Sequence, residues 1–194
     1  MIIELKDISK AVNGRPVLKE INWHIGSEDT WLLTGAAGSG KTLLLRIVLG
    51  LEKADSGSVN LLGDYKYASV NAGVVFQEDR LCEQFSAVEN VAMVNERLSE
   101  MVAEEERGKC LKEEELYVPV SSLDPVTRRI VVIIRACIIP SDVLLMDEPF
   151  RGMEEGLRSR MISYIRDKAG HKGIVFAQRG GEGLEFCRRF DLGG

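Results

Sequence analysis

The sequence predicts an α/β fold with a mainly parallel sheet, and three observations lead to this prediction. From residue 30 onward, short apolar runs typical of strands alternate with stretches typical of helices. A glycine-rich segment, Gly35–Thr42, stands between one such strand and one such helix. A buried strand, Val143–Met146, ends in two carboxylates, Asp147 and Glu148. Because functional groups of parallel sheets gather at the carboxyl ends of the strands, the glycine segment and the carboxylates are expected at one edge.

The first 63 residues are expected to form an antiparallel β subdomain and the strand that leads to the glycine segment. Met1–Ile8 and Val17–Ile25 both have strand character, and apolar residues alternate with polar ones in the second run. Asn13-Gly14 between them favours a hairpin connection. Two further strands are expected, at Thr30–Thr34 and Ser58–Leu62. Trp23 and Trp31 are interpreted as core or sheet residues.

The segment GAAGSGKT has the full spacing G-x-x-x-x-G-K-[ST]. Glycines let successive backbone N–H groups turn inward around a phosphate, and the positive end of the following helix supports the same anion. In this arrangement Lys41 reaches the β- and γ-phosphates and Thr42 ligates Mg²⁺. The alternative is a chance glycine-rich turn. The motif predicts a P-loop NTPase fold and a nucleoside triphosphate held by Gly35, Ala36, Ala37, Gly38, Ser39, Gly40, Lys41 and Thr42.

The rest of the chain supplies the other expected elements. A buried strand, Gly73–Phe76, leads directly into Gln77. The acidic triplets 104–106 and 113–115 are interpreted as a solvated face. Helices are expected at Ala87–Leu98, Glu100–Leu111, Ser121–Pro140, Glu154–Lys168 and Glu182–Arg189, with a last strand at Ile174–Ala177.

Length and composition favour one domain, residues 1–194, with a small helical insert over about 78–140. Its acidic part extends from Glu78 to about Val120. A net charge of −5 argues against non-specific nucleic-acid binding, which needs a basic face. The opening MIIELKDI is not a secretory signal pattern, and the apolar run Ile130–Ile139 is too short to span a membrane. The four cysteines and two histidines lack metal-ligand spacing, so reduced thiols in a cytosolic chain are expected.

Three features occur in order and spacing: the phosphate loop, Gln77 after a strand, and Asp147-Glu148-Pro149 after another. With them the chain, from about Ile3 to Leu184, resembles the ATP-binding subunit of an ABC transporter. The segments GLEKADSGSVNLLG (50–63) and VVFQEDRLCEQFSAVENVA (74–92) look especially similar to ATPases of bacterial importers of the nitrate, sulfonate or taurine type.

The chemistry and the resemblance together imply roles for these residues. Asp147 would hold Mg²⁺ opposite Thr42, with Gln77 as a further contact to the metal or to the attacking water. Glu148 would orient or deprotonate that water, the alternative being a salt-bridged helix cap. By resemblance, Gln77 would pass the nucleotide state to the helical insert, which would dock a membrane permease. A second ATP-binding subunit, and a location on the inner face of the cell membrane, are implied as well.

The chain departs from the family at the signature Leu-Ser-Gly-Gly-Gln, which is matched by Leu123–Thr127. In the family, N–H groups at this helix start grip the γ-phosphate held by a second subunit. Here Asp124 is a strong N-cap, and Pro125 is a favourable first helical residue that has no N–H. A carboxylate about 4 Å from a phosphate is repelled by about 4 kcal/mol per charge pair before screening. Poor binding of ATP by this helix start is therefore expected.

Three other family positions are changed. The histidine that contacts the γ-phosphate after the last strand is matched by Gln178, which is still assigned to the catalytic site. The aromatic residue that stacks on adenine is matched by Val12, which leaves apolar contact with the base. The dimer-contact segment Ser-Ala-Leu-Asp reads Arg151–Glu154.

The resemblance therefore implies an ATP-binding importer subunit that binds MgATP and hydrolyses it weakly. Two other interpretations stay open at this stage. One is a degenerate regulatory subunit that pairs with a full-signature ATPase. The other is a P-loop protein without a transporter, such as a small kinase or a soluble ABC protein of repair or translation. Kinases lack the glutamine segment, and the soluble proteins usually carry tandem cassettes or long inserts, which the chain lacks.

Overall fold

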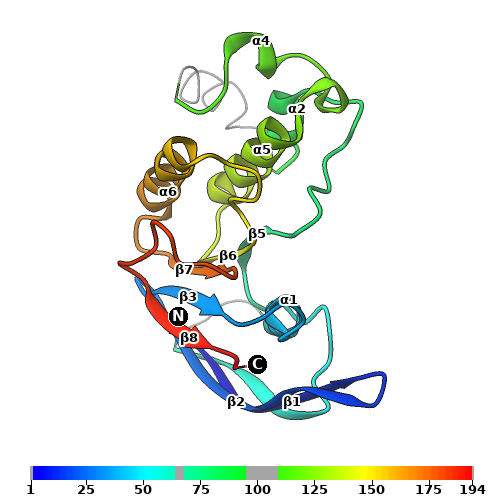
Figure 1. The fold of residues 1–194 in the computed structure, drawn as a ribbon, viewed down its shortest axis with the longest axis vertical. Coiled ribbons are helices and arrows are strands. Elements are labelled where there is room, and N and C mark those ends of the chain that lie inside the picture. Colours follow the sequence, from blue (N-terminus) through cyan, green and yellow to red (C-terminus); the bar gives the residue numbers. More distant parts are fainter. Residues whose placement is uncertain (1, 64–67, 95–108, 194) are drawn as a thin grey trace. The chain divides into compact units, whose positions relative to one another are not determined.

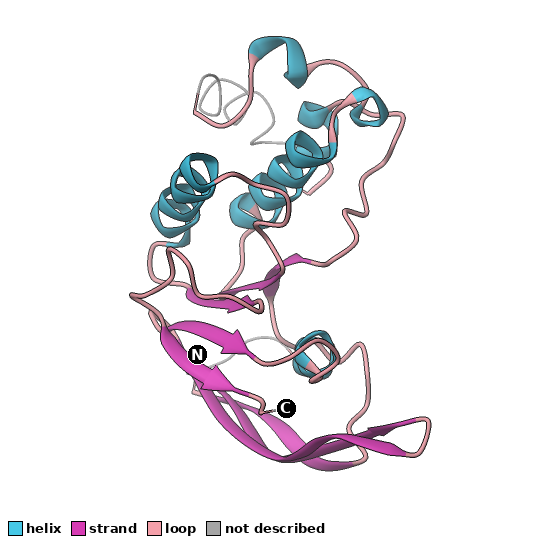
Figure 2. Ribbon diagram, in the orientation of Figure 1, coloured by secondary structure: helices cyan, strands magenta, loops and turns pink. Residues whose placement is uncertain are grey.

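The computed structural model describes residues 2–63, 68–94 and 109–193. These residues form two compact units (Figure 1). The first unit comprises residues 1–74, 141–148 and 169–194, and the second comprises 75–140 and 149–168, within the described ranges. The first unit holds nearly all the strands, whereas the second is mostly helical (Figure 2).

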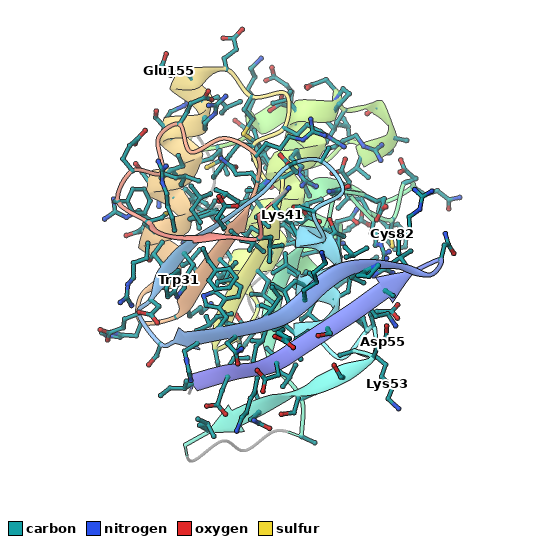
Figure 3. All side chains as sticks on the ribbon, turned by 60° about the horizontal axis from the view of Figure 1, so that its bottom comes forward. Trp31, Lys41, Lys53, Asp55, Cys82 and Glu155 are labelled. Atoms are coloured by element: carbon teal, nitrogen blue, oxygen red, sulfur yellow. The ribbon has the colours of Figure 1, made fainter. Side chains whose placement is uncertain are left out.

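The first unit contains a three-stranded antiparallel sheet in the order β2-β1-β4. Its strands are β1 (Ile2–Val12), β2 (Arg15–Gly26) and β4 (Ser56–Leu62), and Lys53 and Asp55 lie just before β4 (Figure 3). Between β1 and β2, Asn13 and Gly14 have φ values of 52° and 77°. Consecutive left-handed residues are the geometry of a tight hairpin, so the predicted hairpin and antiparallel subdomain are confirmed.

A second sheet carries the predicted parallel strands, in the order β5-β6-β7-β3-β8. Strand β3 pairs in parallel with β7 and with β8, and β6 pairs in parallel with β7. The helix α1 (Lys41–Val48) follows β3. The α/β prediction with a mainly parallel sheet is therefore confirmed. The strands are β3 (Thr30–Thr34), β5 (Ala72–Val75), β6 (Val143–Asp147), β7 (Gly173–Ala177) and β8 (Arg188–Asp191).

The prediction of a helix at Glu182–Arg189 is wrong. Residues 182–187 form turns, and the chain then enters β8 beside β3. Gly183 has φ of 75°, a left-handed conformation that interrupts a helix. Phe190 on β8 stacks on Trp23 with ring centroids 4.6 Å apart, a tertiary contact that a local pattern does not reveal.

The core of the first unit lies between α1 and the two sheets. Leu44, Leu45 and Val48 on α1 are almost completely buried and belong to the same cluster as Trp23 and Val175. Trp23 also meets Trp31 edge to face, with centroids 5.6 Å apart. Both tryptophans are therefore core or sheet residues, as predicted.

The second unit contains four α-helices and one short 3-10 helix, η2, among the described residues. Helix α5 starts four residues later than predicted, because Pro125 fixes its first turn and residues 120–122 form η2. The expected helices at 87–98 and 100–111 fall partly outside the described residues; within them, α2 covers 87–92. Residues 113–115, predicted to be a solvated face, form the first turn of α4. The elements are α2 (Ala87–Ala92), α4 (Glu113–Leu116), η2 (Val120–Ser122), α5 (Pro125–Ile138) and α6 (Glu155–Ala169).

No helix among the described residues has the length and apolar character needed to cross a membrane. The four cysteines, all within those residues, form no disulfide.

Candidate functional site

The glycine-rich loop connects the end of β3 to the start of α1. Gly35, Gly38 and Gly40 have φ values of 149°, 79° and 99°. A side chain at Gly40 would be strained by its backbone and crowded as well, since an added Cβ would lie 2.8 Å from Leu18 Cδ2 and 2.9 Å from Val17 Cγ1. The loop conformation therefore requires glycine at this position.

The start of α1 is left open to an external anion. Its N-cap is Gly40, no side chain caps it, and its first turn carries no acidic residue. The first N–H groups of a helix have no partner inside the helix, and the helix dipole makes this end positive. Here no side chain caps the backbone N–H groups, and the first turn carries no acidic residue that would offset the positive end.

The charge of Lys41 is held at the first half of the loop. The residue is only 7% exposed, and its Nζ donates to the carbonyl oxygens of Gly35 at 2.7 Å and Ala36 at 3.0 Å. Among the described residues no carboxylate forms an ion pair with this ammonium group, and burying a charge without an ionic partner is unfavourable. An anion in the loop would provide that partner.

Thr42 and Asp147 come together although they are 105 residues apart in the sequence. The Thr42 hydroxyl donates to Oδ2 of Asp147 at 2.5 Å, and Asp147 is 1% exposed at the end of β6. A hydroxyl and a buried carboxylate are hard oxygen donors of the kind that Mg²⁺ prefers. These two residues fit a magnesium ion. The expected closeness of Asp147 to the Thr42 hydroxyl is confirmed.

Glu148 and Gln178 lie at the same sheet edge, because Ala177 pairs with both Asp147 and Leu33. The Glu148 N–H donates to Ala177 O at 2.8 Å, and its φ of 47° is rare for a residue with a side chain. The Gln178 N–H donates to Leu33 O at 3.1 Å. The loop, both carboxylates and Gln178 thus occupy one edge of the parallel sheet.

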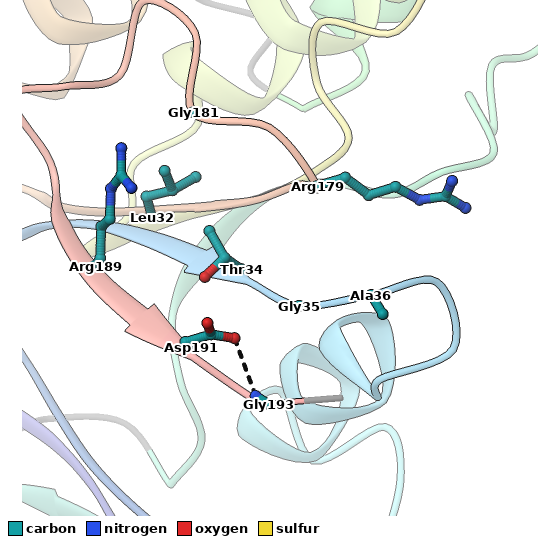
Figure 4. A pocket seen from close by; sticks show the side chains of 9 residues that line it. All are labelled: Leu32, Thr34, Gly35, Ala36, Arg179, Gly181, Arg189, Asp191 and Gly193. Carbon is teal, nitrogen blue, oxygen red and sulfur yellow. Dashed lines mark hydrogen bonds between the residues drawn. The ribbon is translucent and has the colours of Figure 1, made fainter.

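Among the cavities of the described residues, two adjoin the phosphate loop and are lined by residues of the first unit. One, of about 560 Å³, lies between β2 and the loop and is lined by Arg15–Val17 and Ala36–Ser39 among others. Val12 is absent from that lining and is 43% exposed, while its cross-strand partner Arg15 belongs to it. The other cavity, of about 490 Å³, lies beside Gly35 and Ala36 (Figure 4).

Gln77 belongs to the second unit, where its backbone is held by two arginines. Its carbonyl oxygen accepts from Arg151 Nη2 at 3.3 Å and from Arg129 Nη1 at 3.5 Å. Arg129 is 2% exposed and also binds Phe76 O at 2.5 Å and Asp79 Oδ1 at 3.0 Å.

Arg129 was missed by the sequence analysis. It stands four residues before Ile133, and that spacing places both on the buried face of α5. A charged residue on the apolar face of a helix was the signal that could have identified it.

The start of α5 is closed by its own side chains. Asp124 Oδ1 accepts from the N–H groups of Val126 at 2.8 Å and Thr127 at 3.1 Å, and Oδ2 accepts from the Thr127 hydroxyl at 2.5 Å. The hydrogen bond from the Thr127 side chain is the main cause that lowers the pKa of Asp124 below its ordinary value. The predicted cap, with Pro125 as the first helical residue, is confirmed.

Known proteins share both the sequence pattern and the architecture. The family model described as ABC transporter matches residues 18–151. The spermidine/putrescine import ATP-binding protein PotA of Spiroplasma citri is 35% identical over an alignment of length 185, which covers 90% of this chain and 53% of that protein. The sulfate/thiosulfate import ATP-binding protein CysA of Pectobacterium atrosepticum is 32% identical over an alignment of length 210, which covers 99% of this chain and 63% of that protein. The chain spans about half the length of the PotA relatives that it matches.

Solved structures agree on the fold. The dimeric structure of MJ0796, a bacterial ABC transporter cassette, superposes with a TM-score of 0.85 at 22% identity, over 98% of this chain and 94% of that one. A post-hydrolysis dimer of the same cassette, bound to ADP and Pi, gives a TM-score of 0.80 at 20% identity over the same shares. The fold is thus that of a P-loop NTPase cassette, and the family model, which matches more than half of the chain, shows that the chain belongs to the ABC transporter family.

Proposed function

We propose that this chain is the ATP-binding subunit of an ABC importer, and that it binds MgATP at the glycine-rich loop. The observation that carries the proposal is the Thr42–Asp147 hydrogen bond beside an uncapped helix start. This hydrogen bond brings the glycine-rich loop and the Asp147-Glu148 strand together, so that their polar groups can bind one metal–triphosphate complex. The import-type relatives support the transport role.

In this proposal each residue of the loop has a physical task. The backbone N–H groups of residues 35–42 surround the phosphates, and Lys41 exchanges its two carbonyl partners for phosphate oxygens. Thr42 and Asp147 hold Mg²⁺ at the end of β6. The metal, when bound, offsets the charge of the β- and γ-oxygens.

The other predicted residues are assigned in the same way. Glu148 orients or deprotonates the attacking water, and its backbone, fixed by Ala177 O, presents the carboxylate at the sheet edge. Gln178 acts at the γ-phosphate end, Gln77 at the metal or water, and Val12 makes apolar contact with the base. Residues 1–194 act as one ATP-binding domain, with the helical insert over about 78–140.

Weak hydrolysis is part of the proposal, because α5 begins with its own cap. The carboxylate of Asp124 already takes the N–H groups of Val126 and Thr127, and Pro125 has none to offer. A phosphate from a second subunit would meet a filled cap and a negative charge. The same observation favours the second candidate, a regulatory subunit that pairs with a full-signature ATPase.

The partners follow from the importer role. A membrane permease would dock on the helical insert, and a second ATP-binding subunit, identical or different, would complete the assembly on the inner face of the membrane. The finer assignment to importers of the nitrate, sulfonate or taurine type rests on residues 50–63 and 74–92. Nucleic acid is not among the proposed partners, since the net charge is −5.

Calorimetric titration with MgATP tests the binding site. Lys41→Ala is expected to weaken binding at least 100-fold, because the loop loses the charge that reaches the terminal phosphates. The matched control is Arg46→Ala, which removes an exposed positive charge from the same helix. Equal affinities of the wild type and Lys41→Ala would contradict the proposal, provided that both melt cooperatively.

Steady-state ATPase activity distinguishes the two candidate functions. If the chain hydrolyses ATP, Glu148→Gln should abolish that activity while MgATP binding persists. A wild type with no turnover above Glu148→Gln would exclude the active enzyme and leave the regulatory subunit.

A further inference from the structure

We propose that Arg179, rather than Gln178, supplies the positive charge at the terminal phosphate of the bound nucleotide. The inference rests on the proposed binding of MgATP at the glycine-rich loop. It concerns two adjacent residues that follow β7. The side-chain amide of Gln178 binds within its own loop, whereas Arg179 lines a cavity.

Gln178 is held by local hydrogen bonds. Its N–H donates to Leu33 O at 3.1 Å, and its side-chain Nε2 donates to Gly180 O at 2.6 Å. The residue is only 8% exposed. Because the amide group is neutral and its Nε2 is already bound to Gly180 O, Gln178 fixes the turn that carries Arg179 and cannot supply a positive charge to the phosphate.

Arg179 lies in the opposite situation. Its side chain is exposed and lines the 490 Å³ cavity together with Gly35 and Ala36. Among the described residues it makes no hydrogen bond or ion pair. Figure 4 shows that it extends from the end of β7 along the same side of the cavity as Ala36, whereas Arg189 projects near Leu32 and Gly181. Arg179 is therefore an exposed cation beside the first half of the loop.

The position of Lys41 indicates which end of a triphosphate would reach this cavity. Its Nζ lies 2.7 Å from Gly35 O and 3.0 Å from Ala36 O, and a lysine in this motif serves the β- and γ-phosphates. The terminal phosphate therefore belongs at Gly35 and Ala36, where the cavity of Arg179 begins. A guanidinium group can bind two phosphate oxygens at once, which a glutamine amide cannot match in charge.

One carboxylate shares the cavity. Asp191 lines it from β8, and its Oδ1 accepts from the N–H of Gly193 at 3.0 Å. This bond engages the carboxylate within the C-terminal segment, and no ion pair between Asp191 and either arginine is present among the described residues.

The test compares a triphosphate with a diphosphate, so that it isolates the terminal group. Affinities for a non-hydrolysable ATP analogue and for ADP, both with Mg²⁺, are measured by calorimetry on the full chain. Arg179→Ala is expected to weaken binding of the analogue about tenfold and to change ADP binding less than twofold, and Arg179→Lys should restore part of the loss. Arg189→Ala, which removes the same charge from the far part of the same cavity, should leave both affinities unchanged.

The outcomes separate this inference from the function on which it rests. If the wild type binds the analogue and Arg179→Ala leaves the ratio of the two affinities unchanged, Arg179 has no such role, although the chain still binds nucleotide. If Arg189→Ala weakens binding of the analogue as selectively as Arg179→Ala does, the affinity depends on the total charge of the cavity, and the assignment to Arg179 is overturned. If the wild type and Lys41→Ala bind equally, the proposed function fails and the inference with it.

Discussion

Two helix starts in this chain, those of α1 and α5, have opposite chemistry. Helix α1 begins after Gly40 with no side-chain cap and no acidic residue in its first turn. Helix α5 begins after Asp124, whose carboxylate accepts from two backbone N–H groups and from the Thr127 hydroxyl. Both ends carry the same partial positive charge from the backbone. They differ in whether the chain itself supplies the anion.

A helix start can bind an external anion only when no side chain of the chain itself accepts hydrogen bonds from its first N–H groups. A glycine N-cap is less stabilising than aspartate by a few tenths of a kcal/mol and leaves room for a phosphate. Asp-Pro stabilises the helix but occupies the same N–H groups. Nucleotide chemistry in this chain is therefore expected at α1, and α5 serves the structure of its own unit.

The largest expected effect concerns how α5 is held within the second unit. Arg129→Met should lower the free energy of unfolding by about 3–5 kcal/mol, because Asp79 and the Phe76 carbonyl lose a buried charged partner. Arg128→Met is the matched control, since Arg128 pairs with the exposed Glu83 and should cost less than about 1 kcal/mol. Urea unfolding measures both, and equal losses would show that Arg129 does not anchor this helix.

The next effect concerns the open helix start. Gly40→Ala should cost about 2–3 kcal/mol, since the new methyl meets Leu18 and Val17 and the backbone stays left-handed. Gly38→Ala has the same backbone problem with φ of 79° but open space around the Cβ, so about 1 kcal/mol is expected. Thermal unfolding of the two variants separates the two effects, since Gly38→Ala reports backbone strain alone and Gly40→Ala reports strain together with crowding. A larger loss for Gly38→Ala would contradict the packing of Leu18 on the loop.

A third experiment converts the closed helix start into an open one. Replacing Asp124, Pro125 and Val126 by Ser, Gly and Gly restores free N–H groups and removes the negative charge. ATPase activity is expected to rise about tenfold over the wild type, with a dependence on protein concentration that indicates two subunits acting together. Unchanged activity in a variant that still folds would mean that the cap does not limit hydrolysis.

The smallest expected effect is a pH dependence at the same cap. The pKa of Asp124 is lowered from its ordinary value of 3.8, so its carboxylate stabilises the folded state above that value and loses this effect as the pH falls through the lowered pKa. Asn is an equally good N-cap but lacks the charge, so Asp124→Asn should be less stable than the wild type by about 0.3–1 kcal/mol at pH 7, and the gap should close at acid pH. Chemical unfolding at pH 7 and pH 3 checks the sign, which would be reversed if protonation favoured the cap.

Much of the first unit could be predicted because its signals are local. The hairpin depends on Asn13 and Gly14, and the loop depends on motif spacing. The buried strand β6 is apolar up to its final Asp147, and all five of its residues are buried. The meeting of Thr42 and Asp147 then followed from the rule that parallel strands present their carboxyl ends at one edge.

The features that were missed depend on contacts between distant residues. Strand β8 is defined by its pairing with β3 and by the stacking of Phe190 on Trp23, and neither is visible in residues 182–191 alone. The role of Arg129 depends on carbonyl groups about fifty residues away. The hydrogen bond from the Gln178 side chain to Gly180 O depends on a side-chain conformation that no spacing rule predicts.

Strand β8 also protects the strand that carries the phosphate loop. Through β8, the backbone groups on one side of Trp31–Thr34 are paired, and without it β3 would become an unprotected edge open to pairing with another chain. Deletion of residues 188–193 should therefore cause self-association that light scattering detects, even though none of those residues belongs to the glycine-rich motif. Strand β8 thus protects β3, the strand that leads into the glycine-rich loop, from aggregation.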